Sequence, residues 1–391
     1  MMFTCFDAGC ADPRHDHHAR SSARAAATRE RPRPRSRAVV KTRRRKNLRV
    51  DIHCHFFNAQ VAEKIAPLDP GRHDPSVIFA NALTREVNVK QVRDRMPKLS
   101  DIETRLGDMD RMGIDIQAVS PAPHQLCYWT EPDTGRELSR MVNDRLADIV
   151  GTWPDRFVAL GTVPLQNSTL AVAELERCVT NLGFRGIEIN PSVNGMDLTD
   201  PRLDLEKFFA RADELGIVLF LHPIGFSHAE RLVDHYFNNV IGNPMETTIA
   251  ASHLIFDGVM QRHRRLKVIL PHAGGYLAHY WGRMDHAYRA RPDCRTVLRR
   301  APSTYLARMY FDTITFDPDM LRLMIDRFGP EHVLLGTDYP YDMGEEDPVG
   351  ALAAVPRLAR AERAMIEGMN AARLLDIRGT TPTRNRRKGS A

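Results

Sequence analysis

Two histidines flank a cysteine early in the chain, and their types and spacing are those of a metal site. His53, Cys54 and His55 follow the apolar residues Val50 and Ile52, so they fall at the end of a predicted buried strand. Successive side chains of a strand point to opposite faces, which puts His53 and His55 on one face and Cys54 on the other. Two neighbouring imidazoles are the start of a divalent-metal site. Two unrelated structural histidines would fit this short motif equally well.

Three more predicted strands end in residues of the same kind, namely His222, His272 and Asp338. A single strand-terminal histidine is more often structural than a ligand. Buried histidine and aspartate are nevertheless costly unless they are paired or bind a metal. In barrels of parallel strands the active site is built at the carboxyl ends of the strands. We therefore expect these three residues to meet His53 and His55 at one rim.

The elements that must position these residues alternate between strand-like and helix-like segments. The predicted strands are continuous apolar runs, which is typical of parallel strands buried on both faces. They cover residues 48–53, 116–120, 157–162, 184–190, 217–222, 267–272, 309–313 and 332–338. Helical spacing covers residues 101–112, 137–150, 168–182 and 205–215, with Ser100 as the expected N-cap of the first helix.

This alternation predicts an α/β fold, a (β/α)8 TIM-like barrel, with a doubly wound sheet as the alternative. Residues 56–100, polar and rich in charge, are expected to form an irregular insertion that could cover the strand end. Three parts follow: a leader over 1–47, a barrel over 48–377 and a tail over 378–391.

Charge is distributed unevenly along the 391 residues. The net charge is +6, but residues 1–47 carry 13 Lys and Arg against four Asp and Glu, and residues 378–391 carry five basic residues and no acidic one. The remaining body has a net charge of −8, which argues against a nucleic-acid-binding domain. Both ends are expected to be disordered, since they have too little apolar surface to offset chain entropy. The leader could be inert, an organelle-targeting peptide or a polyanion-binding arm.

The remaining composition predicts a cytoplasmic protein without a membrane segment. No apolar run approaches the roughly 20 residues that span a bilayer. The six cysteines are scattered without Cys-x-x-Cys spacing, as expected for reduced thiols.

The strand-end motifs together resemble a known family. The pattern VDIHCH…FLHP…PHAGG…GTDYP resembles the amidohydrolase superfamily, in its subgroup of metal-dependent decarboxylases, over about residues 48–377. Within the subgroup the resemblance is greatest to the 2-amino-3-carboxymuconate-6-semialdehyde decarboxylases, which also share stretches at 127–129, 156–162, 244–248 and 289–293. Met196 and the pair Ile224-Gly225 depart from that group, whose members carry a tryptophan at the first position and an aromatic and an acidic residue at the second.

The resemblance implies roles for particular residues. His53, His55, His222 and Asp338 would ligate one Zn²⁺, although Mn²⁺ or Co²⁺ would also fit. His272 would be the general base and acid that activates the metal-bound water. No lysine ends the strand 184–190, so a single metal is expected.

Two arginines would bind substrate carboxylates. Arg291 matches the family arginine that reaches into the neighbouring subunit, which implies a homodimer. The second falls at Arg93, with Arg95 as a near competitor.

The sequence thus predicts a zinc-dependent decarboxylase, free of organic cofactors, that acts on a small unsaturated or aromatic carboxylic acid. Two alternatives remain: a hydrolase or hydratase that uses the same metal water, and a non-enzymatic protein with a structural zinc.

Overall fold

A computed structural model describes residues 3–4, 15–16 and 47–377. Contacts divide the chain into two units, residues 1–44 and 45–391. In the first, β1 (Phe3–Thr4) pairs in parallel with β2 (His15–Asp16). The disorder expected for the leader and for residues 378–391 concerns segments that lie almost wholly outside the described residues.

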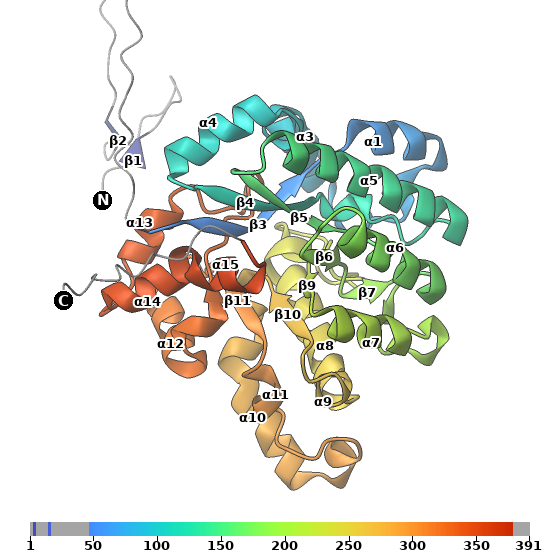
Figure 1. Cartoon of the computed structure of the whole chain (residues 1–391), viewed down its shortest axis with the longest axis vertical. Helices are drawn as coiled ribbons and strands as arrows, with labels where there is room; N and C mark the ends of the chain where they lie inside the picture. The colour runs from blue at the N-terminus through green and yellow to red at the C-terminus, as the bar shows by residue number, and fades with distance from the viewer. Residues whose placement is uncertain (1–2, 5–14, 17–46, 378–391) are drawn as a thin grey trace, which may run out of the picture. The chain divides into compact units, whose positions relative to one another are not determined.

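The second unit is built on eight parallel strands in one sheet, in the order β12-β11-β10-β9-β6-β5-β4-β3. Figure 1 shows them surrounded by helices. Their bounds are β3 Val50–Phe56, β4 Ile116–Pro121, β5 Phe157–Gly161, β6 Gly186–Ile189, β9 Val218–Leu221, β10 Lys267–Leu270, β11 Tyr310–Asp312 and β12 Val333–Leu334.

The sheet closes on itself through hydrogen bonds between its first strand and the segment after its last. Ile52 N donates to Leu335 O at 2.9 Å, and His55 N donates to Tyr339 O at 2.8 Å. The (β/α)8 barrel predicted from the alternating pattern is therefore confirmed. Six of the strands are shorter than predicted because their apolar runs extend beyond the last ladder bond, whereas β3 and β4 continue past their predicted ends to Phe56 and Pro121.

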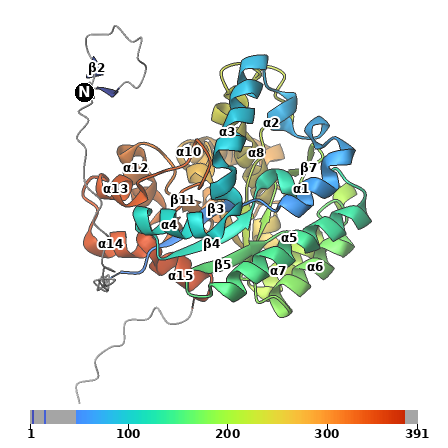
Figure 2. The ribbon, with the colours of Figure 1, turned by 90° about the horizontal axis from the view of Figure 1, so that it is seen from above.

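Helices cover the outside of the barrel (Figure 2). The main ones are α4 Ile102–Met112, α5 Pro132–Thr152, α6 Ser168–Thr180, α7 Glu206–Leu215, α8 Asn243–Phe256, α10 Leu277–Ala290 and α12 Pro318–Phe328. The expected cap of α4 was wrong by one residue. Asp101, not Ser100, accepts from Thr104 N at 2.8 Å, and Ser100 is the last residue of the preceding helix.

The insertion after β3 is helical, which corrects the expectation of an irregular segment. It contains α1 (Ala59–Ile65), α2 (Pro75–Ile78) and the 19-residue α3 (Ala82–Ser100). Asparagine or aspartate caps each of these helices at its start. The apolar residues of α3 do not gather in one stripe, and Leu83 and Val89 are 68% and 72% exposed. A helix without a regular apolar face gives no periodic signal in the sequence.

Two hydrophobic clusters stabilise the unit. The larger fills the space between strands and helices, and the smaller fills the barrel at its amino end, where Val50, Ile116 and Val218 pack with Leu374 of α15 (Asn370–Leu374). Each fully buried side chain of this size contributes about 1.5–3 kcal/mol. The amino end is therefore a packed interior, and the chemistry must lie elsewhere.

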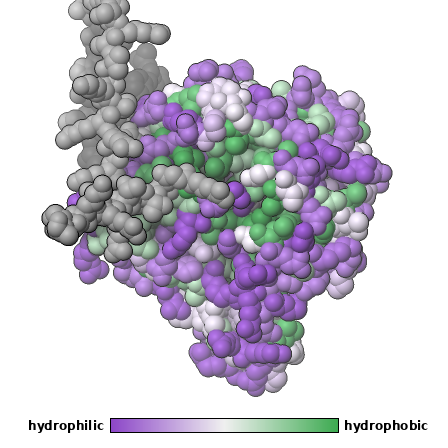
Figure 3. Space-filling view, in the orientation of Figure 1, coloured by the Kyte–Doolittle hydropathy of each residue, from purple (hydrophilic) through white to green (hydrophobic). Residues whose placement is uncertain are grey.

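Helix α10 and the segment after it project from the barrel as a lobe, formed by α10, η7 (Pro292–Arg295) and α11 (Ser303–Leu306) (Figure 1). On the face shown in Figure 3 this lobe is mostly hydrophilic. Among the described residues, no helix combines the length and apolar character that crossing a bilayer would require.

Candidate metal centre

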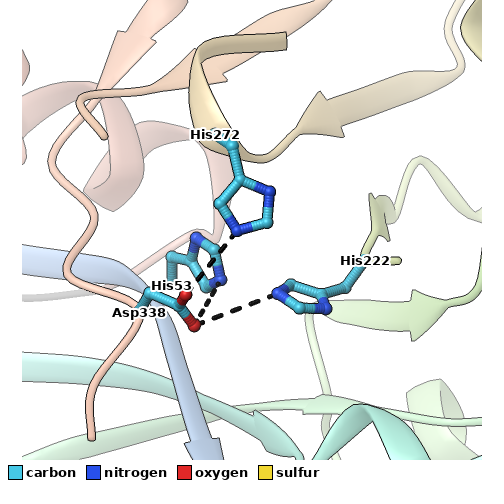
Figure 4. Close-up of side chains that lie close together, drawn as sticks. All are labelled: His53, His222, His272 and Asp338. Atoms are coloured by element: carbon cyan, nitrogen blue, oxygen red, sulfur yellow. Dashed lines mark ion pairs between the residues drawn. The ribbon is translucent and has the colours of Figure 1, made fainter. Parts of the chain in front are cut away.

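Four of the predicted residues converge at the carboxyl end of the barrel. His53 lies in β3, His222 directly follows β9, His272 follows β10 and Asp338 follows β12. Their ligand atoms all lie within 4.8 Å of one another. Figure 4 shows the three imidazoles directed at the Asp338 carboxylate.

His55 lies in the same cluster, and Asp338 is its centre. Asp338 Oδ1 lies 3.3 Å from His53 Nε2 and 3.2 Å from His55 Nε2. It is 4.0 Å from His222 Nε2, and Asp338 Oδ2 is 3.6 Å from His272 Nε2. The structure thus brings together every predicted residue of the rim.

The cluster contains buried nitrogen and oxygen atoms that form no hydrogen bond with any described residue. His53 Nε2, His55 Nε2, both ring nitrogens of His222 and Asp338 Oδ1 are buried without a hydrogen-bond partner in the described part of the chain. Buried polar atoms normally form hydrogen bonds, so a group of buried atoms without them indicates that a bound partner belongs there. Imidazole nitrogens with a carboxylate oxygen are the ligands that Zn²⁺ and similar ions take. The residues present therefore fit a divalent cation.

Hydrogen bonds on the far side of two rings fix their orientation. His53 Nδ1 lies 2.7 Å from Asp312 Oδ2, and His55 Nδ1 lies 3.0 Å from the carbonyl oxygen of Pro121. An acceptor at Nδ1 requires a proton there, which leaves a lone pair on Nε2. Metal-binding histidines are usually held in this way.

The electrostatics of the cluster also favour a cation. Burial alone would raise the pKa of Asp338, but the charge of His53 and the close approach of the histidine rings hold that pKa well below its ordinary value. Burial and the neighbouring histidine charges lower the pKa of His222 well below the ordinary value. Burial opposes protonation of His53, yet Asp338 and Asp312 raise its pKa to about 10. The site therefore attracts positive charge, and the lowered pKa of His222 keeps that imidazole neutral with a lone pair available.

Sequence reasoning missed three buried acids beneath the rim, Asp51, Glu188 and Asp312, all with 0% exposure. Asp51 Oδ2 accepts from Thr337 Oγ1 at 2.7 Å and from Gln117 Nε2 at 3.0 Å, which ties the ends of the barrel sheet together. Burial raises the pKa of Asp51 to about 6 and that of Glu188 to about 8. The sequence signal that could have indicated these residues was a single acidic residue within an otherwise apolar predicted strand.

A cavity of about 290 Å³ opens beside the cluster. His222, Asp338 and Arg95 line it. Arg95 Nη1 donates to Pro340 O at 2.7 Å, and its Nε donates to Gln91 Oε1 at 2.8 Å.

The other two predicted arginines lie away from the cluster. The Arg93 side chain is 75% exposed and pairs with Asp94 at 3.4 Å. It is not among the residues that line the cavity. Arg291 lies at the end of α10 on the projecting lobe, 65% exposed, and pairs with Asp293 at 2.7 Å. Neither arginine touches the metal-type residues of its own chain in the described structure.

Of the residues that depart from the resembled group, Ile224 and Gly225 line the cavity directly after His222. Met196 lies in β8 (Met196–Asp197) of a short hairpin and is not among the lining residues. The departure at Ile224 and Gly225 therefore bears on the shape of the cavity.

Comparisons with known proteins agree with this geometry. The amidohydrolase family model matches residues 50–377. The 2-amino-3-carboxymuconate-6-semialdehyde decarboxylase of Dictyostelium discoideum is 33% identical over 278 residues, covering 71% of this chain and 77% of its own. The gamma-resorcylate decarboxylase of Rhizobium sp. (strain MTP-10005) is 30% identical over 306 residues, covering 74% of this chain and 91% of its own.

A solved structure shows the same fold. The 5-carboxyvanillate decarboxylase from Sphingomonas paucimobilis superposes with a TM-score of 0.75 at 27% sequence identity, covering 84% of this chain and 99% of its own. The predicted family is thus confirmed by sequence and by fold: the chain belongs to the amidohydrolase family, among relatives that are named decarboxylases.

Proposed function

We propose that this protein is a metal-dependent decarboxylase of a small unsaturated or aromatic carboxylic acid, and that zinc is its metal. The observation that carries the proposal is a group of buried nitrogen and oxygen atoms around Asp338 that have no partner among the described residues. This group opens onto a cavity lined by Arg95. The names of the relatives support the reaction class.

His53, His55, His222 and Asp338 would hold the ion. A bound divalent ion can lower the pKa of a water molecule from 15.7 to about 7 and polarise substrate oxygens. The imidazole of His272 could also bind the ion. The choice of His53, His55, His222 and Asp338 as the four ligands is therefore part of the proposal.

His272 would handle the proton of the reaction. Decarboxylation breaks a carbon–carbon bond and replaces the lost carboxylate with a hydrogen, so the substrate carbon must receive a proton. The His272 side chain is 15% exposed, and its Nδ1 has no hydrogen-bond partner among the described residues. An imidazole at this place can take up a proton and deliver it to the substrate.

Arg95 would bind a carboxylate of the substrate. A guanidinium fork matches a carboxylate bidentately, and the Nη2 of Arg95 is not used by its bonds to Pro340 and Gln91. We prefer Arg95 to Arg93 because only Arg95 lines the cavity.

Arg291 would act on a second copy in a homodimer. Its lobe projects from the barrel, and Tyr276 and Tyr280, one helical turn apart at the start of α10, are 38% and 66% exposed. Mixing inactive Arg291→Ala and His272→Asn proteins under subunit exchange should restore part of the activity. No restoration would contradict a shared site.

The cysteines fit the expected cytoplasmic setting, which we retain as part of the proposal. Cys54, Cys127, Cys178 and Cys294 are free thiols.

The direct test is CO2 release by the purified full-length protein. The panel should contain 2-amino-3-carboxymuconate-6-semialdehyde, gamma-resorcylate and 5-carboxyvanillate, with the metal content measured in the same sample. The proposal expects release from at least one acid and loss of activity on chelation. A substrate that gains water without losing carbon would select the hydrolase or hydratase alternative, and no turnover on the panel would count against the decarboxylase.

A further inference from the structure

Asp312 is a buried carboxylate that bonds to the imidazole of one residue of the cluster and to the backbone of another. It ends β11, has 0% exposure, and lies 259 residues along the chain from His53. Its Oδ2 accepts from His53 Nδ1 at 2.7 Å and from the main-chain N–H of His272 at 2.9 Å. One oxygen atom thus contacts both the side chain of a proposed ligand and the backbone of the proposed base.

The second oxygen holds the turn that carries His272. Asp312 Oδ1 accepts from Ala273 N at 2.8 Å and from Ile314 N at 3.1 Å. Both His272 and Ala273 have left-handed backbone conformations, with φ of 50° and 54°. Residues other than glycine rarely adopt such angles unless surrounding contacts impose them, and they cluster at functional sites.

We propose that Asp312 is a positioning residue that sets His53 and His272 together. Its acceptor fixes the proton of His53 on Nδ1, so that the Nε2 lone pair faces the cluster. The same carboxylate holds the strained turn that directs the His272 ring at Asp338. The inference rests on the proposed metal centre but not on the identity of the substrate.

The chemistry of the carboxylate explains why an amide cannot replace it. All four donors around Asp312 need acceptors, and Asn offers one acceptor oxygen and one donor group. An amide nitrogen at the Oδ2 position would face His53 Nδ1 and favour the tautomer with its proton on Nε2, the wrong side for a metal. An amide nitrogen at the Oδ1 position would place one donor against another, the Ala273 N–H, so the hydrogen bond that holds the turn would be lost.

A matched control lies in the same network. Asp51 is also fully buried and also has four donors, but it touches only the main-chain N–H of His53, at 3.1 Å, and not its ring. Its other donors are Gln117 Nε2 and the main-chain N–H and hydroxyl of Thr337. Asp51→Asn therefore reproduces the loss of a buried carboxylate without freeing the imidazole.

The experiment compares Asp312→Asn, Asp51→Asn and the unmodified full chain by zinc affinity in competition with a chelator. We expect Asp312→Asn to weaken zinc binding about 10- to 100-fold, as loss of a carboxylate behind a metal-binding histidine does, and Asp51→Asn to change it less than threefold. In the zinc-loaded protein, the NMR signal of the His53 Nδ1 proton should persist in Asp51→Asn and disappear in Asp312→Asn. Equal zinc affinities, or equal losses in both variants, would overturn the proposal.

Asp312→Glu keeps the test decisive if Asp312→Asn does not fold. The longer side chain retains a carboxylate for His53 but cannot keep all three main-chain donors. We expect zinc affinity within about tenfold of the unmodified protein and faster amide hydrogen exchange at residues 272 and 273. Unchanged exchange there would refute the coupling, whereas failure of the decarboxylase assay would leave both readouts intact.

Discussion

The two ends of the barrel are made by the same eight strands, yet they contain opposite kinds of interior. At the amino end, the apolar side chains of Val50, Ile116 and Val218 pack against Leu374. At the carboxyl end, the same strands lead to imidazoles and carboxylates, several of whose atoms have no partner in the described protein. The contrast teaches that packing at the amino end stabilises the fold. The carboxyl end can therefore carry unpaired polar groups, whose burial costs folding free energy.

Removing Asp338 should have the largest effect on this comparison. Asp338→Ala takes away the carboxylate around which the four histidines gather, so the metal content should fall towards zero. Metal chemistry contributes several kcal/mol to such reactions, and activity should fall at least about 10³-fold. Elemental analysis and the CO2 assay measure the two effects. Full metal content and normal turnover in Asp338→Ala would contradict the assignment of the metal chemistry to the carboxyl end.

Replacing His272 should separate proton transfer from metal binding. We expect His272→Asn to lower turnover about 10²- to 10⁴-fold, the usual contribution of a positioned acid or base, while zinc stays bound. If zinc is lost instead, His272 is a ligand, as its place within 4.8 Å of the other donor atoms also permits. His55→Asn, analysed in parallel, should lose zinc and with it turnover, because His55 is a proposed ligand.

A cavity at the amino end should change stability and leave chemistry alone. Leu374 is 8% exposed in the smaller cluster, so Leu374→Ala should lower the free energy of unfolding by about 2–5 kcal/mol. Turnover per folded molecule should stay within about twofold. Denaturant unfolding and the CO2 assay check this together, and a selective loss of turnover would show that the two ends are coupled.

The smallest expected effect distinguishes the two arginines of α3. Arg95→Met should lower kcat/KM about 10- to 100-fold, since hydrogen bonds to charged groups contribute about 1.5–3 kcal/mol. Arg93→Met is the matched control, and its 75% exposed side chain predicts less than a twofold change. Steady-state kinetics on the active substrate measure both, and the reverse order would restore Arg93 as the carboxylate-binding residue.

Much of the fold and most of the rim were predictable because their signals are local. Apolar runs of strand length, each followed by helical spacing, predicted the barrel that the structure closes between Ile52 and Leu335. Residues that end apolar strands in parallel barrels meet at one rim, which is why His222, His272 and Asp338 could be grouped with the His-x-His motif. The helical insertion was not predictable, since α3 lacks a regular apolar face.

The sequence alone therefore determined the architecture, the family and the set of residues that face the cation site. Only the tertiary structure decided that Arg95 rather than Arg93 lines the cavity, and that Asp312 holds both His53 and the turn of His272. The physical reason is range. Strand and helix periodicity depends on residues that are near one another in the sequence. The hydrogen bond between His53 and Asp312, 259 positions apart, forms only when the barrel has closed.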